Sequence, residues 1–208
     1  MTGTALAIYV LFALLAFVGR GWLQYRRTGD HGVRGFSGRA GSIEWFGGAF
    51  LTLGAFADLL ALVADLEGSA SRFWFVPAPV RLGGLALMGL GVVLALAAQT
   101  DMGSSWRVGV QSTETTELVT TGLFRWVRNP IFAAMLMVLL GLLLTVPNVI
   151  ACVALVASLV GIELHVRRVE EPYLVRVHGE RYLSYAQRVG RFVPGLGRIT
   201  WKNSAVSR

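Results

Sequence analysis

The sequence predicts an all-α protein: a multi-pass membrane helical bundle of about five transmembrane helices with a cytoplasmic C-terminal helical cap. Composition is the first observation behind this prediction. Of the 208 residues, 54% are hydrophobic and only 15% are charged, and the mean hydropathy is +0.60. A soluble domain of this size needs a charged exterior that these residues cannot supply. The second observation is that the apolar residues come in blocks about as long as a membrane span, ~20 residues.

These apolar blocks give the positions of the helices. Three blocks are clear: Ala5–Gly19, Ile43–Ala64 and Val80–Ala98. A fourth apolar region, Ile131–Leu164, is too long for one span and slightly short for two. We expect it to form a tight helical hairpin that turns at Pro147 and Asn148. The last two of the five helices should therefore be short or tilted.

The basic residues predict the orientation. No basic residue precedes the first block and Arg20 follows it, so we expect a retained helix with its N-terminus outside, and not a cleaved signal peptide. Five spans then place 17 of the 19 Lys and Arg on one side, in segments 20–41, 99–129 and 165–208. The positive-inside rule makes this side cytoplasmic. The net charge of +7 then suits anionic membrane lipids and does not indicate nucleic acid.

Several residues inside the spans have structural interpretations. The small residues in the run from Gly83 to Gly91 are spaced for close helix contact. Cys152, the only cysteine, is typical of a small buried hydrophobe, and no metal site is expected. Asp58 falls inside the second helix, where an unpaired charge is expensive, so a structural role and a role in a site are both open.

The chain re-enters the membrane at a segment that can bind a polar ligand. Pro130 suits the first turn of a helix, Asn129 offers both a donor and an acceptor, and Arg128 can hold a carboxylate in a bidentate fork.

A second candidate segment follows the last span. Arg167, Glu170 and Glu171 lie at spacings of three and four, so we expect them on nearly one helix face, and Tyr182 and Tyr185 repeat that spacing. Arg167 can also pair with Glu163 four residues earlier. A pocket made from both segments would hold carboxylates for amines or ribose hydroxyls, an arginine for a carboxylate, and aromatic walls for a purine. Such a pocket suits S-adenosyl-L-methionine; the alternative is a basic juxtamembrane belt with solvated glutamates and interfacial tyrosines.

Both segments resemble one enzyme family. Residues from Leu118 to Phe132 resemble the "LVTxGxYxxxRHPxY" signature of the isoprenylcysteine carboxyl methyltransferase (ICMT) family, in a bacterial branch with Arg-Asn-Pro in place of Arg-His-Pro. The family's "EExxLxxxFGxxYxxYxxxVxxxxP" tail is matched by Glu170, Glu171, Leu174, Gly179, Tyr182, Tyr185, Val189 and Pro194. Two motifs in the right order on either side of a helical hairpin are more specific than either alone.

The resemblance implies a cytoplasmic pocket for S-adenosyl-L-methionine and a separate lipophilic substrate tunnel that opens toward the bilayer. The cofactor-binding residues, including both tyrosines as aromatic walls, would be Leu118, Val119, Phe124, Asn129, Pro130, Phe132, Glu170, Tyr182 and Tyr185. The catalytic candidates are Arg128, Arg167 and Glu171, although Arg167 is one residue out of register with the family arginine. The expected organisation is a three-helix membrane region (1–98), an ICMT-like cofactor-binding core (99–199) and a tail (200–208).

The sequence departs from the family pattern at three positions. Asn129 replaces the family histidine, and Phe124 and Phe132 replace tyrosines. Asn129 can still form hydrogen bonds but cannot titrate near neutral pH, so the methyl acceptor is left open. The lack of an obvious general base is no objection, because methyl transfer to a thiolate or carboxylate depends on alignment and water exclusion.

Three functions are therefore weighed. The first is a methyltransferase in a bacterial inner (plasma) membrane, acting at its cytoplasmic face on a lipophilic small-molecule or lipid-linked carboxylate, thiol or lipid amine. The second is an NADPH-dependent membrane reductase of an isoprenoid or sterol-like substrate, for which the tail has arginines to spare. The third is a non-catalytic membrane scaffold, because fold alone does not guarantee function.

Overall fold

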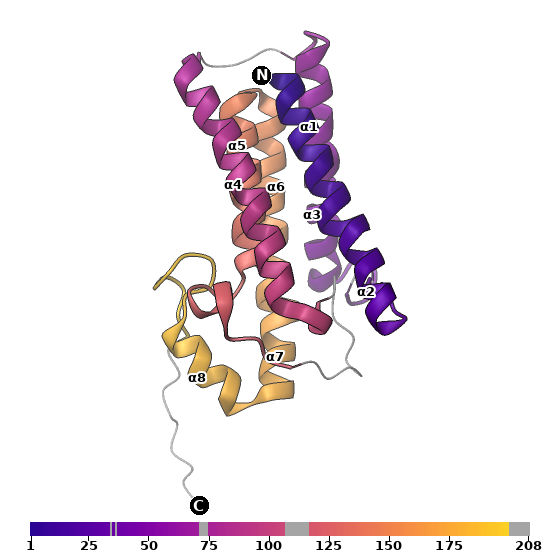
Figure 1. The fold of residues 1–208 in the computed structure, drawn as a ribbon, viewed down its shortest axis with the longest axis vertical. Coiled ribbons are helices and arrows are strands. Elements are labelled where there is room, and N and C mark those ends of the chain that lie inside the picture. The colour runs from indigo at the N-terminus through magenta and orange to yellow at the C-terminus, as the bar shows by residue number, and fades with distance from the viewer. Residues whose placement is uncertain (34, 36, 71–74, 107–116, 200–208) are drawn as a thin grey trace, which may run out of the picture.

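The computed structural model describes residues 1–33, 35, 37–70, 75–106 and 117–199, and the predicted tail 200–208 lies outside them. Within these residues the chain forms a bundle of long helices with a small helical cap at one end (Figure 1). The helical elements are α1 (Thr2–Ala13), η1 (Leu14–Gly19), α2 (Arg20–Thr28), α3 (Ile43–Leu66), α4 (Ala78–Met102), η2 (Gly103–Ser105), η3 (Gly122–Arg125), α5 (Pro130–Thr145), α6 (Val149–His165), η4 (Val166–Glu170), α7 (Glu171–His178) and α8 (Glu180–Arg188). Of the short elements, η1 and η4 are π-helical and η2 and η3 are 3₁₀ turns.

The long helices confirm an integral membrane protein. Among the described residues, four helices are long and apolar enough to cross a bilayer: Thr2–Thr28, Ile43–Leu66, Ala78–Met102 and Val149–His178. The fifth, α5, is apolar but has only 16 residues. The expectation that the last two helices are short or tilted is confirmed for α5, which is short, whereas its partner α6 continues through η4 into α7 as one helix of 30 residues.

The hairpin turns where the sequence predicts. The Asn148 side-chain oxygen accepts the N–H of Ala151 at 2.9 Å and so caps α6. The other end of the Asn148 amide donates to the carbonyl of Ala61 in α3 at 3.0 Å. At the opposite end of the hairpin, α5 begins at Pro130, whose missing N–H is no loss in a first turn. Both ends of α5 are therefore determined by local chemistry.

Glycines set the spacing of the bundle, in which α4 packs on α5 and α3 packs on α6. A Cβ added to Gly84 would lie 2.7 Å from the carbonyl oxygen of Gly141, and one added to Gly91 would lie 2.8 Å from that of Ala134. A Cβ on Gly47 would lie 3.1 Å from the His165 nitrogen. Such contacts are possible only between backbones that approach closely, as the small residues of 83–91 predict.

The two ends of the bundle differ in composition. One end, called here the basic end, carries α2, the C-terminal end of α4, α7 and α8, whereas the N-terminus, the C-terminal end of α3 and the α5–α6 turn lie at the other (Figure 1). The segment before α5 and the segment after α8 therefore meet at the basic end, although more than 50 residues separate them.

Candidate functional site

The segment that enters α5 is held in place by the C-terminal segment. The N–H of Arg128 donates to the carbonyl of Gly190 at 2.8 Å, and the N–H of Asn129 donates to that of Arg191 at 3.0 Å. Val127 also forms an isolated parallel bridge with Gly190. Gly190 has no room for a side chain, since a Cβ there would lie 2.1 Å from the Val193 carbonyl oxygen. This backbone pairing brings the two predicted motifs together.

Arg128 connects the elements of the cap. Its side chain is 2% exposed and donates to the carbonyls of Ala186 and Val189 at 3.0 and 2.7 Å and to that of Gly197 at 3.1 Å. A fourth bond, of 2.7 Å, joins it to the carboxylate of Glu171. These bonds give Arg128 a structural role in the cap, and the residue also lines the cavity described below, with a buried Nε that has no partner among the described residues.

Glu171 lies between two arginines. Besides Arg128, it accepts two bonds from Arg191, at 2.8 and 2.9 Å. By accepting these bonds, the carboxylate raises the pKa of the Arg191 guanidinium above its usual value. A carboxylate that is only 12% exposed and has two cationic partners is satisfied within the protein. Glu171 does not line the cavity described next.

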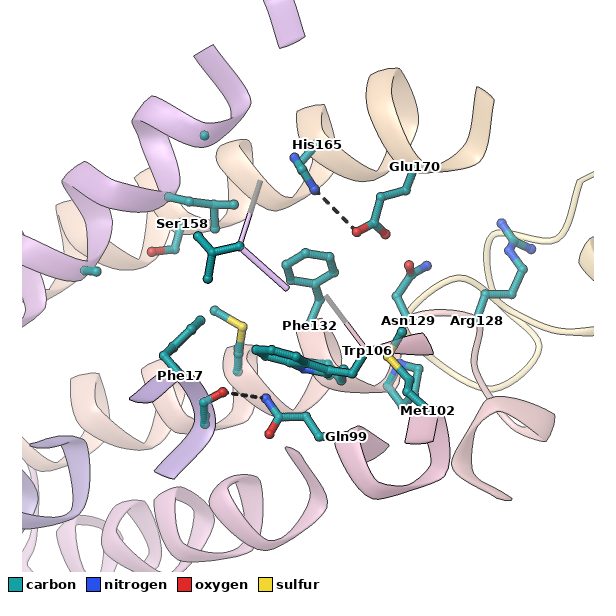
Figure 2. Close-up of a pocket in the computed structure, with 18 of the residues that line it drawn as sticks. Phe17, Gln99, Met102, Trp106, Arg128, Asn129, Phe132, Ser158, His165 and Glu170 are labelled. Carbon is teal, nitrogen blue, oxygen red and sulfur yellow. Dashed lines mark hydrogen bonds and ion pairs between the residues drawn. The ribbon is translucent and has the colours of Figure 1, made fainter. Parts of the chain in front are cut away.

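A cavity of about 680 Å³ runs from the cap into the membrane part of the bundle (Figure 2). All nine residues predicted to bind the cofactor line it: Leu118, Val119, Phe124, Asn129, Pro130, Phe132, Glu170, Tyr182 and Tyr185. The structure therefore brings the predicted cofactor-binding set together around one space, whose volume is in the range of ordinary small-molecule sites.

The polar groups of the cavity gather near the cap. Glu170 and His165 point toward each other, with Nε2 3.4 Å from a carboxylate oxygen, and the Phe132 ring lies edge-on 5.9 Å from the imidazole (Figure 2). His165 and Glu170 are five residues apart, a spacing that a π-helical turn such as η4 places on one face. Asn129 completes this group, and its Nδ2 donates to the Arg191 carbonyl at 3.2 Å.

Aromatic rings form the cap side of the cavity. Tyr182 and Tyr185 are buried with their rings 6.3 Å apart. The Tyr185 hydroxyl donates to the Phe124 carbonyl at 2.5 Å, and burial raises the pKa of Tyr185 to about 12, so it stays protonated at physiological pH. Trp106, which is 3% exposed, lines the cavity from the segment after α4.

The inner part of the cavity is mostly apolar. It is lined by α1 and α3, including Phe17 and Phe56, which are 42% and 69% exposed. Asp58 also lines this part.

Arg167 lies outside the cavity. Its side chain is 56% exposed and pairs with Glu163 one turn earlier, the alternative that the sequence also offers. Arg167, Glu170 and Glu171 each have a different set of partners, and of the three Glu170 lines the cavity. They lie in and beside η4, whose wider turn shifts the angular spacing of an ordinary α-helix.

Comparisons with known proteins agree with this geometry. Residues 80–181 match the family model described as phospholipid methyltransferase. The solved structure of the eukaryotic intramembrane Ras methyltransferase ICMT (isoprenylcysteine carboxyl methyltransferase) has a similar fold, with a TM-score of 0.50, 18% sequence identity and 96% of each chain covered. Residues 80–181 are thus similar to the phospholipid methyltransferase family, and the fold of the chain is ICMT-like. No curated protein sequence matches it.

Sequence reasoning about this ICMT-like protein missed several residues of the cavity. His165 lies at the end of the apolar stretch and has no motif of its own; its spacing of five from Glu170 becomes informative only once η4 is seen. Gln99, near the end of α4, and Trp106, after it, also line the cavity (Figure 2). The one available signal was polarity, since Gln99 is the first strongly polar residue at the end of an apolar block.

Proposed function

We propose that this protein is an S-adenosyl-L-methionine-dependent methyltransferase that methylates a small lipophilic acceptor at the cytoplasmic face of the membrane. The observation that supports this most directly is the shape of the cavity. Its cap end is polar and aromatic, whereas its inner end, lined by α1 and α3, is mostly apolar. One space can thus hold a charged cofactor at one end and a lipophilic acceptor at the other.

The residues at the cap end fit this cofactor. The Glu170 carboxylate can accept hydrogen bonds from an amine or from ribose hydroxyls, and Asn129 adds a second polar contact. Tyr182 and Trp106 supply aromatic faces for a purine and for a positively charged sulfur. When bound, the cofactor would supply an activated methyl group.

The protein's own contribution would be alignment and exclusion of water. The Arg128–Glu171–Arg191 network fixes the segment that carries Asn129, and the π-helical turn η4 fixes Glu170 beside His165. Fixed positions of this kind reduce the entropic part of the barrier for a transfer that needs little proton chemistry. The buried aromatic wall keeps water from the reacting atoms.

The test is a calorimetric titration of the detergent-purified protein with S-adenosylhomocysteine. We expect saturable binding by the wild type and binding at least about tenfold weaker in Glu170→Ala, a loss of about 1.4 kcal/mol. The matched control is Glu163→Ala, which removes a carboxylate from the same helix but outside the cavity. Absence of binding by folded wild-type protein would overturn the proposal.

One observation supports the reductase as a second candidate. A surface pocket of about 430 Å³ beside the cavity is lined by Thr120 and by three arginines, Arg125, Arg181 and Arg188. Such a basic pocket suits the 2′-phosphate of NADPH. Titration with NADPH in the same assay distinguishes the methyltransferase from the reductase. Saturable binding of NADPH without binding of S-adenosylhomocysteine favours the reductase. If neither ligand binds and Asn129→His creates cofactor binding, the scaffold interpretation gains.

A further inference from the structure

Asp58 is a buried carboxylate that the methyl-transfer proposal does not use. It lies in the middle of α3, it is 1% exposed, and it lines the inner part of the cavity. Among the residues that the structure describes, neither of its carboxylate oxygens has a hydrogen-bond partner. An unpaired carboxyl group inside a membrane protein is expensive to keep, and such residues usually mark a ligand or ion path.

The neighbours of Asp58 do not supply a donor. Tyr9, on the facing wall of α1, directs its hydroxyl to the backbone carbonyl of Ala55 at 2.9 Å. The cavity is otherwise lined by apolar side chains such as Phe12 and Leu59 and by the Ser158 hydroxyl, which packs against Gly54 one turn before Asp58 and makes no hydrogen bond to it. An acceptor group of this kind, open to a cavity, lacks a donor that a ligand could provide.

The position of Asp58 determines the distance between the donor group of a ligand and the end of that ligand at the cap. Gly47 in α3 packs directly against His165, which pairs with Glu170 at the polar end of the cavity. Asp58 is eleven residues further along the same helix, a rise of about 16 Å. A ligand that spans both groups therefore has a polar atom at each end of a long apolar chain.

We infer that Asp58 binds a hydroxyl or amine group at the far end of the methyl acceptor, which is then an aliphatic chain with polar groups at both ends. This inference rests on the proposed function, which makes the molecule bound in the cavity a methyl acceptor. The apolar walls between Asp58 and Glu170 hold the chain, and Asp58 accepts the hydrogen bond from its distal donor. A tail made only of hydrocarbon leaves the carboxyl group unpaired, so Asp58 selects against it.

The experiment measures binding of three matched probes in detergent: dodecanoate, ω-hydroxydodecanoate and ω-aminododecanoate. Each is titrated calorimetrically into the wild type and into Asp58→Leu. Partition of a probe into micelles is the same for both proteins, so the ratio of its affinities isolates the effect of Asp58. We expect the preference for either ω-substituted probe over dodecanoate to fall at least about tenfold in Asp58→Leu, as loss of one buried hydrogen bond to a charged group predicts.

A second variant keeps the test decisive if Asp58→Leu does not fold. Asp58→Asn preserves the shape and an acceptor oxygen but removes the charge, so it should retain the preference for the hydroxyl probe and lose that for the amine. Equal preferences in the wild type and in a folded variant overturn the inference, as does failure of all three probes to bind wild-type protein. Titration of the wild type with S-adenosylhomocysteine reports separately on the proposed function.

Discussion

The polar groups at the two ends of the cavity differ in how many hydrogen bonds they make within the protein. At the cap, the Glu171 carboxylate binds both Arg128 and Arg191, and Arg128 also donates to surrounding carbonyls, while its Nε has no partner among the described residues. In the membrane part, both carboxylate oxygens of Asp58 are buried without a partner among the described residues. The comparison separates two kinds of polar residue: those whose bonds are mostly made within the protein hold the fold together, and those with none are available to a ligand.

The largest effect should come from breaking the completed network. Glu171→Gln leaves two buried guanidiniums without their carboxylate, and we expect a loss of about 3–5 kcal/mol of stability. The measurement is thermal unfolding in detergent. The matched control is Glu163→Gln, whose pair with Arg167 is exposed and should contribute about 0–1 kcal/mol. Similar losses in the two variants would show that the network is not structural.

The stability of the membrane part should depend on side-chain volume between helices, whereas that of the cap should depend on its ion pairs. Gly91→Ala puts a methyl group 2.8 Å from the Ala134 carbonyl oxygen and the Val138 side chain, so α4 and α5 must separate. We expect a loss of about 1–3 kcal/mol in the same thermal assay. Gly89→Ala, in the same helix with nothing within 4 Å of the added carbon, should be neutral or slightly stabilising. A neutral Gly91→Ala would contradict close packing as the basis of this region's stability.

The smallest effect should come from a single neutral hydrogen bond in the cap. Tyr185→Phe removes the bond to the Phe124 carbonyl but keeps the aromatic wall, so we expect a loss of about 0.5–1.5 kcal/mol. Binding of S-adenosylhomocysteine should weaken only modestly. Tyr25→Phe, an exposed tyrosine in α2, is the control and should have no measurable effect. A loss of all binding in Tyr185→Phe would mean that the hydroxyl, and not the ring, contacts the ligand.

The sequence was sufficient for the membrane helices and for the part of the cavity lining that carries the two motifs. Apolar blocks of bilayer length predict membrane helices because a helix satisfies its own backbone hydrogen bonds in lipid, and Pro147 with Asn148 predicts the turn through local chemistry. The residues around the cavity were found through motif resemblance. Their roles as cofactor contacts remain predictions, since the structure gives their positions and not their ligand.

Side-chain pairing could not be predicted in the same way. Arg128 is 43 residues from Glu171 and 63 from Arg191, and nothing in the local sequence says that they share one carboxylate. The different partners of Arg167, Glu170 and Glu171 depend on η4, a departure from regular helix geometry that periodicity arguments assume away. Long-range pairs and irregular turns are tertiary properties, and both determine which charged groups face the cavity.

The π-helical turn η4 has a consequence for how the protein can change. An ordinary α-helix advances about 100° per residue, so one extra residue in a turn sets the rotational phase between the membrane helix and everything that follows it. Deleting one residue between Val166 and Glu170 would regularise the helix and turn α7 and α8 away from the segment that enters α5. The rotational position of the cap relative to the membrane core thus depends on the number of residues in η4. Chimeras that join them from different relatives must preserve the residue count across this turn, whatever residues occupy it.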